Sequence, residues 1–152
     1  MISSTVMSRT CSSELVAIGI DVVEISKVRN LLSYGTLRVK RVFNSVELAI
    51  GGNDGRAAPL RAGERLIRRM ACTFAVKEAV FKSLGRGWGQ GMRWSEVCAV
   101  KEENGRWSVS LRGQALRRLR ALDGSHVEAC VSTAGNHAIA QAFIYKIPNP
   151  NK

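Results

Sequence analysis

Three charged side chains stand out in this chain because their neighbours in the sequence are apolar. Asp21 lies inside a strand-like run, Gly-Ile-Asp-Val-Val-Glu-Ile over residues 19–25. Glu78 and Lys82 are four residues apart in the run Phe-Ala-Val-Lys-Glu-Ala-Val-Phe-Lys over residues 74–82, so they share one face of a helix. A charge is costly to bury unless something pairs with it. A divalent cation together with a phosphorylated ligand is one such partner, and this interpretation points to an enzyme.

Each of these features also has a purely structural explanation. Glu78 and Lys82 taken alone predict an exposed helical ion pair of little consequence. Asp21 can be a satisfied core carboxylate or the cap of the helix that follows, and Glu24 lies nearer to that helix and can serve as its cap too. The local patterns leave these alternatives open.

A glycine-rich segment follows the second run, with four glycines at alternate positions over residues 85–91. Such a segment lets the backbone approach a ligand closely and can turn N–H groups toward an anion. It fits neither the dinucleotide-binding fingerprint nor the Walker-type phosphate loop, so alone it is a weak signal.

Hydrophobic spacing predicts the elements that must position these residues. A strand is expected over residues 15–25, then a short helix capped by Ser26, and a second short helix opened by a capping box of Asn44 and Glu47. The longest helix is expected over residues 64–84, with Gly85 placed to end it.

The second half of the chain reads as two hairpins around a basic helix. The expected strands and helix are residues 94–101, 106–111, 114–122, 126–132 and 137–147, with Asn104-Gly105 as the first hairpin turn and Arg117, Arg118 and Arg120 facing outward. This order predicts an α+β fold, an antiparallel sheet packed on one long helix and shorter helices. We expect one domain over residues 14–147, a flexible N-terminal extension over residues 1–13 and a tail over residues 148–152.

Composition excludes several classes of protein. No stretch approaches the roughly 18 apolar residues of a membrane span, so we expect a soluble protein without a membrane partner. The four cysteines (Cys11, Cys72, Cys98 and Cys130) lie far apart, which indicates neither a zinc site nor a disulfide framework and fits a reducing cytoplasm. The net charge of +11 implies an acidic partner: nucleic acid, an anionic membrane surface, a phosphorylated ligand or an acidic protein.

Taken together, the motifs resemble the holo-acyl-carrier-protein synthases, the small bacterial type of 4′-phosphopantetheinyl transferase. The family's Gly-x-Asp-x-x-x-Ile stands at residues 19–25, its Phe-x-x-Lys-Glu-Ala-x-x-Lys at residues 74–82, and its Gly-x-Gly at residues 85–87. Phe43 and Glu47 match the Phe-x-x-x-Glu at the entry to the second helix. The resemblance covers about residues 16–144, in order, and implies that family's fold.

The resemblance implies a reaction and a role for each residue. A serine of an apo acyl carrier protein attacks the β-phosphate of coenzyme A, phosphopantetheine is transferred for fatty acid or polyketide synthesis, and 3′,5′-ADP leaves. Asp21 and Glu78 hold a Mg²⁺, Lys82 reaches the same phosphates, and Glu78 is the expected base, directly or through a water that the metal holds. The other residues implied to contact coenzyme A are Lys77, Gly85, Arg86, Gly87, Ser132 and Thr133.

The resemblance also implies partners. Carrier proteins of this class are acidic, so the five basic residues between Ile25 and Val46 are expected to form a docking face; they are Lys27, Arg29, Arg38, Lys40 and Arg41. A merely solvated basic face is the alternative. By analogy with the family we expect a homotrimer with active sites between the subunits.

Three features depart from the family pattern. Thr133 stands where many members have a histidine, and Thr73 stands where a basic residue often precedes the motif phenylalanine, with Arg68 and Arg69 one turn earlier. The loop over residues 51–63 is also longer than usual. These departures suggest a specialised member that serves a polyketide or other secondary-metabolite carrier, and they leave a non-catalytic carrier-binding homologue as an alternative.

The charge leaves a basic nucleic-acid-binding protein as a second alternative. Such a protein should interleave aromatic and basic residues or carry a known binding motif. The chain has only 6% aromatic residues and shows neither feature, so no nucleic-acid partner is expected.

Overall fold

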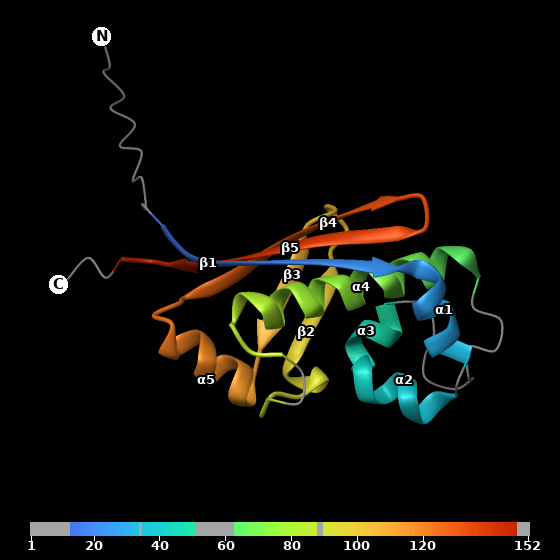
Figure 1. The fold of residues 1–152 in the computed structure, drawn as a ribbon, viewed down its shortest axis with the longest axis horizontal. Helices are drawn as coiled ribbons and strands as arrows, with labels where there is room; N and C mark the ends of the chain where they lie inside the picture. Colours follow the sequence, from blue (N-terminus) through green and yellow to red (C-terminus); the bar gives the residue numbers. More distant parts are fainter. Residues whose placement is uncertain (1–12, 34, 51–62, 88–89, 149–152) are drawn as a thin grey trace, which may run out of the picture.

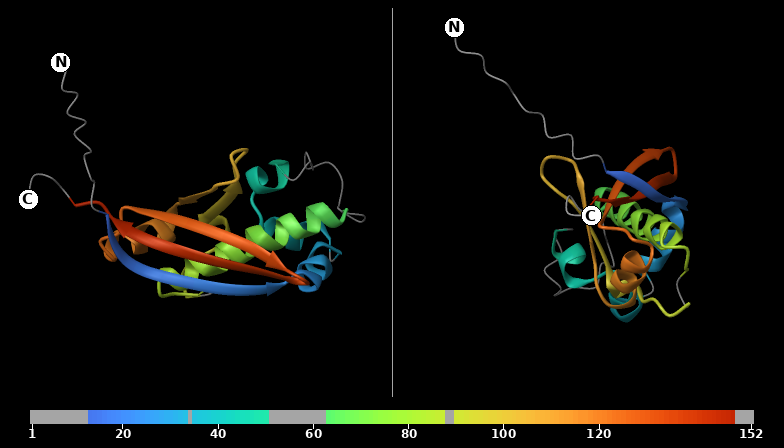
Figure 2. Two further views of the ribbon diagram at one scale, coloured as in Figure 1. Left: turned by 90° about the horizontal axis from the view of Figure 1, so that it is seen from above. Right: turned by 90° about the vertical axis from the view of Figure 1, so that its left-hand side faces the viewer.

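The structure is a computed structural model that describes residues 13–33, 35–50, 63–87 and 90–148. Five antiparallel strands form one sheet in the order β1-β5-β4-β3-β2, and the sheet curves around one long helix, α4 (Figures 1 and 2). The strands are β1 (Glu14–Glu24), β2 (Val97–Lys101), β3 (Trp107–Leu111), β4 (His126–Ala134) and β5 (His137–Lys146). The helices are α1 (Ile25–Ser33), α2 (Thr36–Val42), α3 (Ser45–Ile50), α4 (Glu64–Ser83) and α5 (Gly113–Ala121), with a 3₁₀ turn at Trp94–Glu96.

Small residues let α4 lie unusually close to the sheet. Three successive inward-facing side chains of β5 are alanines, Ala138, Ala140 and Ala142, and all three are fully buried. On β1, a β-carbon added at Gly19 would overlap the carbonyl oxygen of Ala79 on α4. The glycine of the first motif is therefore required by a backbone-to-backbone contact between β1 and α4.

Most of the predicted elements are confirmed. The helix expected over residues 64–84 is α4, and the strand expected over residues 15–25 is β1. The capping box is present: the Glu47 amide donates to Asn44 Oδ1 at 3.0 Å, and the Asn44 amide donates to Glu47 Oε2 at 2.8 Å. Asn104-Gly105 turns the β2–β3 hairpin, with Gly105 at a φ of +85°.

Three local predictions are wrong. Helix α1 begins at Ile25, so Ser26 lies inside its first turn, where the Ser26 hydroxyl donates to the Glu24 carboxylate instead of capping the helix. Helix α2 was not predicted at all. Strand β2 begins at Val97, because Trp94–Glu96 form the 3₁₀ turn.

Several expectations concern segments that the structure does not describe. Apart from Ser13 and Pro148, the N-terminal extension and the C-terminal tail lie outside the described residues, as does the loop over residues 51–63 apart from Gly63. In the part of the chain that is described, no helix has both the length and the apolar character needed to cross a membrane.

Candidate active site

Strand β1 and helix α4 bring Asp21 and Lys82 into contact. The Lys82 ammonium donates to Asp21 Oδ1 at 2.7 Å, although 61 residues separate the two in the sequence. The Asp21 side chain is only 13% exposed, whereas that of Lys82 is 53% exposed. The partner of Lys82 is therefore the carboxylate of the neighbouring strand, not Glu78 on its own helix.

Glu78 is the second carboxylate of this site, and it is half-buried. Burial is the main cause that raises its pKa above the ordinary value; the negative charge of Asp21 raises it further, and Lys82 opposes both. Two carboxylates thus repel one another at a half-buried position, with one lysine nearby. Such a site favours the binding of a proton or a cation.

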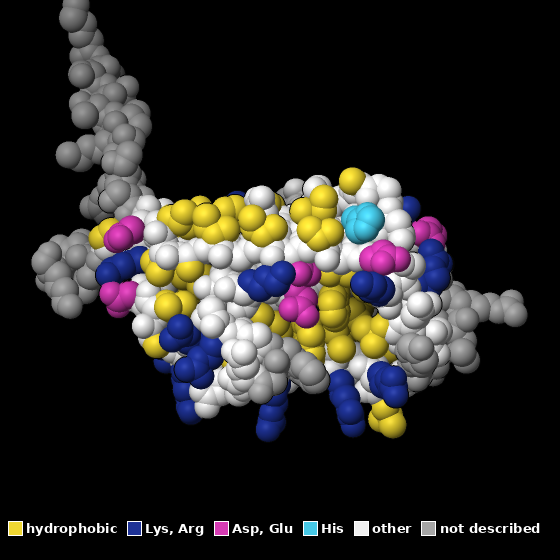
Figure 3. Space-filling model, in the orientation of Figure 1, with side chains coloured by type: hydrophobic (Ala, Val, Ile, Leu, Met, Phe, Trp, Pro, Cys, Tyr) yellow, Lys and Arg dark blue, Asp and Glu magenta, His cyan; other side chains and the backbone are white. Residues whose placement is uncertain are grey.

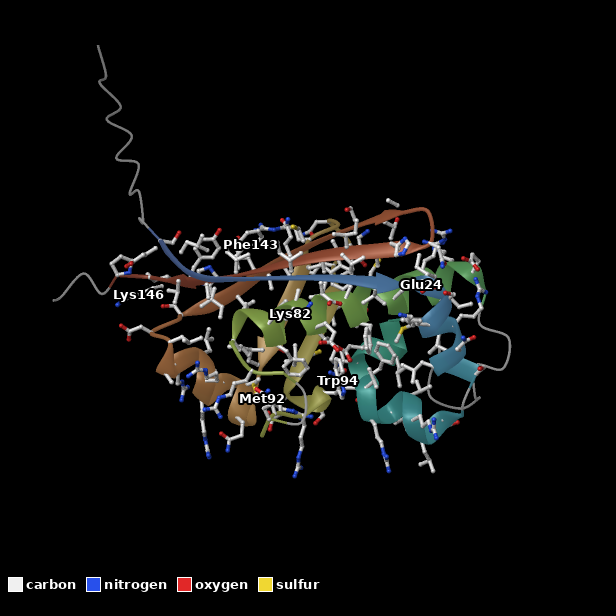
Figure 4. The ribbon with its side chains drawn as sticks, viewed as in Figure 1. Glu24, Lys82, Met92, Trp94, Phe143 and Lys146 are labelled. Carbon is white, nitrogen blue, oxygen red and sulfur yellow. The ribbon has the colours of Figure 1, made fainter. Side chains whose placement is uncertain are left out.

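A pocket of about 450 Å³ opens beside the two carboxylates. Glu24 and Lys27, from the junction of β1 and α1, also line it. Figure 4 shows Glu24 at the end of β1 and Lys82 on α4 beneath that strand. The rest of the wall is apolar and comprises Val22, Val23, Val28, Leu31 and Phe74. The pocket is therefore lined by the carboxylates of Asp21, Glu24 and Glu78, by Lys27 and by a group of apolar side chains.

The donor set fits a magnesium ion that is also held by a ligand. Among the described residues, no group of three or more His, Cys, Asp or Glu side chains could hold an ion, so an ion here would have at most two of these side chains as ligands. Mg²⁺ commonly uses one or two protein carboxylates and completes its octahedron with phosphate oxygens and waters. The mutual repulsion that raises the pKa of Glu78 is what such a cation would relieve.

Lys77 does not line a coenzyme A channel, which corrects the expectation from the sequence. Its side chain is 0% exposed and pairs with Glu47, which is 0% exposed as well. The helix turns by about 100° per residue, so Lys77 points away from the face of Glu78 and toward α2 and α3. The capping position of Glu47 gave no sign that this carboxylate would have a lysine partner 30 residues away.

The glycine loop begins where α4 ends. Gly85 adopts a φ of +70°, and Gly87 has open space where a side chain would stand. Arg118 of α5 donates from Nε to the Leu84 carbonyl at 2.9 Å, and its guanidinium lies beside Gly85. Arg118 is half-buried, so the prediction that it faces outward with Arg117 and Arg120 is wrong for this residue.

Ser132 and Thr133 are not brought together with Asp21 and Glu78 in one chain. They line a different pocket, of about 580 Å³, with Trp107. A different face of α4 contributes to that pocket through Arg65, Arg68, Arg69 and Cys72. Of the predicted coenzyme A residues, Ser132 and Thr133 line this second pocket, and none is among the residues that line the pocket beside Asp21 and Glu78.

The predicted basic face is exposed and extends over α1 and α2. Two of its members form surface ion pairs: Lys27 lies 3.9 Å from Glu24, and Arg29 lies 2.5 Å from Glu64. The remaining three, Arg38, Lys40 and Arg41, belong to α2. Because α2 was not predicted, the placement of these three residues on one short helix could not be expected from the sequence.

The chain is similar to known proteins over most of its length. The model of the 4′-phosphopantetheinyl transferase superfamily matches residues 17–142. A holo-[acyl-carrier-protein] synthase of Shewanella amazonensis is 33% identical over 131 residues, which cover 86% of this chain and 98% of the relative. The synthase of Geobacillus kaustophilus is 32% identical over 133 residues, covering 88% and 91% of the two chains.

Solved structures share the fold. The acyl carrier protein synthase of Plasmodium yoelii with ADP bound has a TM-score of 0.75 at 23% identity and covers 89% of this chain and 98% of its own. A coenzyme A complex of the synthase described as Chronobacterium ammoniagenes ACPS has a TM-score of 0.66 at 21% identity, with coverages of 91% and 99%. At these identities the likeness concerns the fold, whereas the family match spans both motifs. The chain therefore belongs to the 4′-phosphopantetheinyl transferase superfamily.

Proposed function

We propose that this protein is a holo-acyl-carrier-protein synthase, which transfers 4′-phosphopantetheine from coenzyme A to a serine of an apo acyl carrier protein. The observation that carries the proposal is that Asp21 and Glu78, from the two motifs that define the resemblance, line one pocket, with Lys82 hydrogen-bonded to Asp21. Relatives that carry this name align with nearly their whole length.

Asp21 and Glu78 hold Mg²⁺ in this proposal, and the ion when bound neutralises charge that develops on the pyrophosphate oxygens of coenzyme A. Lys82 is already held beside Asp21 at 2.7 Å and is half-exposed, so its ammonium can exchange part of this contact for a phosphate oxygen. The loop of Gly85, Arg86 and Gly87 continues the same end of α4 and lines the coenzyme A channel.

The transfer itself is a displacement at phosphorus. The serine oxygen forms a bond to the β-phosphorus, and the bond from that phosphorus to the oxygen bridging the two phosphates breaks. The electron pair leaves with 3′,5′-ADP. Glu78 takes the serine proton in this proposal, directly or through a water that the metal holds.

An acidic carrier protein docks on the basic face in this account. Lys27 lines the pocket of the two carboxylates, so the face begins at the mouth of the site and continues along α1 and α2. Opposite charges across such a surface steer the carrier toward the pocket and fix its orientation. The carrier can serve fatty acid or polyketide synthesis.

A homotrimer with active sites between subunits accounts for two further features. The outer face of β1 exposes a row of apolar side chains, each about half exposed: Leu15, Ile18, Ile20 and Val22. Figure 3 shows apolar side chains gathered along the upper edge, where β1 and β5 lie in Figure 1. Contact between copies at this face would cover that surface. It would also let Ser132 and Thr133 of one subunit contact coenzyme A bound at Asp21 and Glu78 of the next.

The reaction takes place in the cytoplasm in this proposal, since the described cysteines Cys72, Cys98 and Cys130 are free thiols.

Intact-mass measurement tests the function. The protein is incubated with coenzyme A, Mg²⁺ and candidate apo carriers, and a phosphopantetheine adduct is expected on at least one carrier. Carrier binding without an adduct on any of them would favour the non-catalytic homologue instead.

A further inference from the structure

Lys77 and Glu47 form a buried ion pair whose polar atoms are all engaged. The Lys77 ammonium donates three hydrogen bonds, to Glu47 Oε1 at 3.0 Å, to Glu47 Oε2 at 2.8 Å and to the Val42 carbonyl at 2.7 Å. Glu47 also accepts from the amides of Asn44 at 2.8 Å and Ala99 at 2.9 Å. One lysine and one glutamate therefore connect the end of α2, the start of α3, strand β2 and helix α4.

Stability alone is a weak reason for such a pair. Removing two charges from water costs more than their attraction returns in many proteins, and well-packed apolar residues of similar volume are often as stable. The best-attested use of a buried charged group is to fix the register of the elements it joins. In this chain the junction fixes α4 at the residue immediately before Glu78.

The position of Glu78 depends on that register. Residues 77 and 78 share a peptide unit, so a rotation of α4 at Lys77 carries Glu78 through the same angle. On its other side α4 contacts the backbone of β1 at Gly19, and its polar link to that strand comes from Lys82, whose side chain is half-exposed and not enclosed like that of Lys77. The hydrogen bonds of Lys77 are directional.

We infer that the Lys77–Glu47 pair is a positioning pair, which holds the rotation of α4 so that Glu78 faces Asp21 across the pocket. The inference rests on the proposed function, because it concerns the geometry of the proposed metal site. Lys77 touches neither substrate nor metal in this account and acts only through Glu78.

The test compares a neutral double variant with the wild type. Lys77→Met combined with Glu47→Gln removes both charges, and the glutamine oxygen can still accept from a backbone amide. Glu47→Gln alone leaves a buried ammonium without its counter-charge and should lower Tm by roughly 6–20 °C. The Tm of the double variant should return most of the way to the wild-type value, as circular dichroism and calorimetry would show.

Two readouts separate positioning from stability. We expect the folded double variant to bind Mn²⁺, used as the probe and followed by electron paramagnetic resonance, at least about tenfold more weakly, and to lose at least about tenfold in kcat, since small misplacements in a site have large effects. Wild-type Mn²⁺ affinity and kcat in the folded double variant would overturn the inference.

A second variant keeps the test valid if the double variant does not fold. Glu47→Asp retains both charges and draws the carboxylate back by one methylene group, so a smaller loss of Mn²⁺ affinity and kcat is expected; unchanged values overturn the inference. Lys146→Met with Asp123→Asn removes an exposed ion pair of 2.6 Å and is the matched control, expected to change neither readout. Since Mn²⁺ affinity needs no carrier, a wild type that binds Mn²⁺ but transfers nothing counts against the proposed function alone.

Discussion

Two lysines on one helix have opposite environments, and the difference assigns their roles. Lys77 is fully buried and uses its three donors within the protein. Lys82, five residues later, is half-exposed and makes a single described bond, to Asp21. Donors that remain in reach of solvent can bind a ligand, whereas donors enclosed by protein can only hold structure. At the scale of single residues, we therefore propose Lys82, together with Asp21 and Glu78, as the functional side chains.

Asp21→Ala or Glu78→Ala should lower turnover by at least about 100-fold, because each removes one of the two carboxylates proposed to bind the metal. Neither change should unfold the protein, since neither side chain is fully buried. The rate of adduct formation by intact mass and the circular dichroism spectrum check this. Glu128→Ala, at an exposed position on β4, is the control. Wild-type activity in the Asp21 or Glu78 variant would remove the metal-site assignment.

The raised pKa of Glu78 predicts a pH dependence of stability in metal-free protein. The folded state binds the Glu78 proton more tightly than the unfolded chain does. This contribution to stability is present below the ordinary pKa of 4.5 and is lost as the pH rises through the raised, folded-state pKa. Glu78→Gln does not titrate, so its free energy of unfolding relative to wild type should increase over that window.

Urea unfolding in the presence of a chelator measures this difference at pH values on both sides of the window. Excess Mg²⁺ should reduce it, because the cation stabilises the ionised carboxylate of the wild type. A difference that stays constant with pH would show that burial and the charge of Asp21 do not raise the pKa of Glu78.

At the scale of elements, the separation of β1 and α4 determines the site. Gly19 allows their backbones to touch, and Asp21 follows two residues later on the same face of the strand. The first motif thus contains both the glycine that allows close packing, Gly19, and the carboxylate of the site, Asp21. A side chain at residue 19 would push apart the two elements that carry Asp21 and Glu78.

Gly19→Ala should lower the free energy of unfolding by about 3 kcal/mol or more, since the added carbon overlaps backbone atoms of α4 that cannot move aside. Gly63→Ala is a matched control, because its φ of −59° suits alanine and a β-carbon there meets nothing within 4 Å. Denaturant titration compares the two. Equal stability of both variants would contradict the close contact.

The sequence predicts elements well where a pattern is local and long. Helix α4 and strand β1 follow from hydrophobic spacing, and the capping box of α3 follows from Asn44 and Glu47. Helix α2 escaped prediction because it has seven residues, follows Gly35 without a side-chain cap, and buries only Val39 among its residues. Short helices of this kind depend on tertiary packing more than on their own sequence.

The same limit applies to the site. The motifs identify Asp21, Glu78 and Lys82, but the partner of each charge is a long-range contact that local spacing does not reveal. Lys82 pairs across 61 residues and Lys77 across 30. The family resemblance predicts Lys77 at the ligand, and only the folded chain shows this lysine enclosed, which is rare for the residue type.

At the scale of the whole molecule, the surface is divided between an apolar side and basic sides. Apolar side chains follow the outer face of β1, while Lys and Arg side chains project from the opposite edge (Figure 3). The net charge of +11 favours association with an acidic partner. An apolar row and a charged face on different sides allow contact between copies and carrier binding at the same time.

Ile18→Glu should dissociate the proposed trimer, because it places a charge in the centre of the apolar row where copies would meet. Light scattering after size exclusion should then report one chain of 16.6 kDa instead of three. Leu37→Glu is the control: Leu37 is more exposed, at 81%, but lies on α2. A wild type that is already monomeric would contradict the trimer.

Reversing charge on α2 should weaken carrier binding and leave coenzyme A binding unchanged. Lys40→Glu with Arg41→Glu changes two exposed cations of the basic face. We expect the KM for an acidic carrier to rise roughly tenfold at low salt and by less at high salt, because exposed charges are screened. An unchanged KM would support the alternative of a merely solvated basic face.

The most direct test of the account is a structure of the protein with coenzyme A and Mg²⁺. We expect one metal ion bound by Asp21 and Glu78, the pyrophosphate on that ion and on Lys82, and the Gly85–Gly87 loop along the nucleotide. Coenzyme A bound elsewhere, with Asp21 and Glu78 contacting neither metal nor phosphate, would contradict the central claim that these two carboxylates form the transfer site.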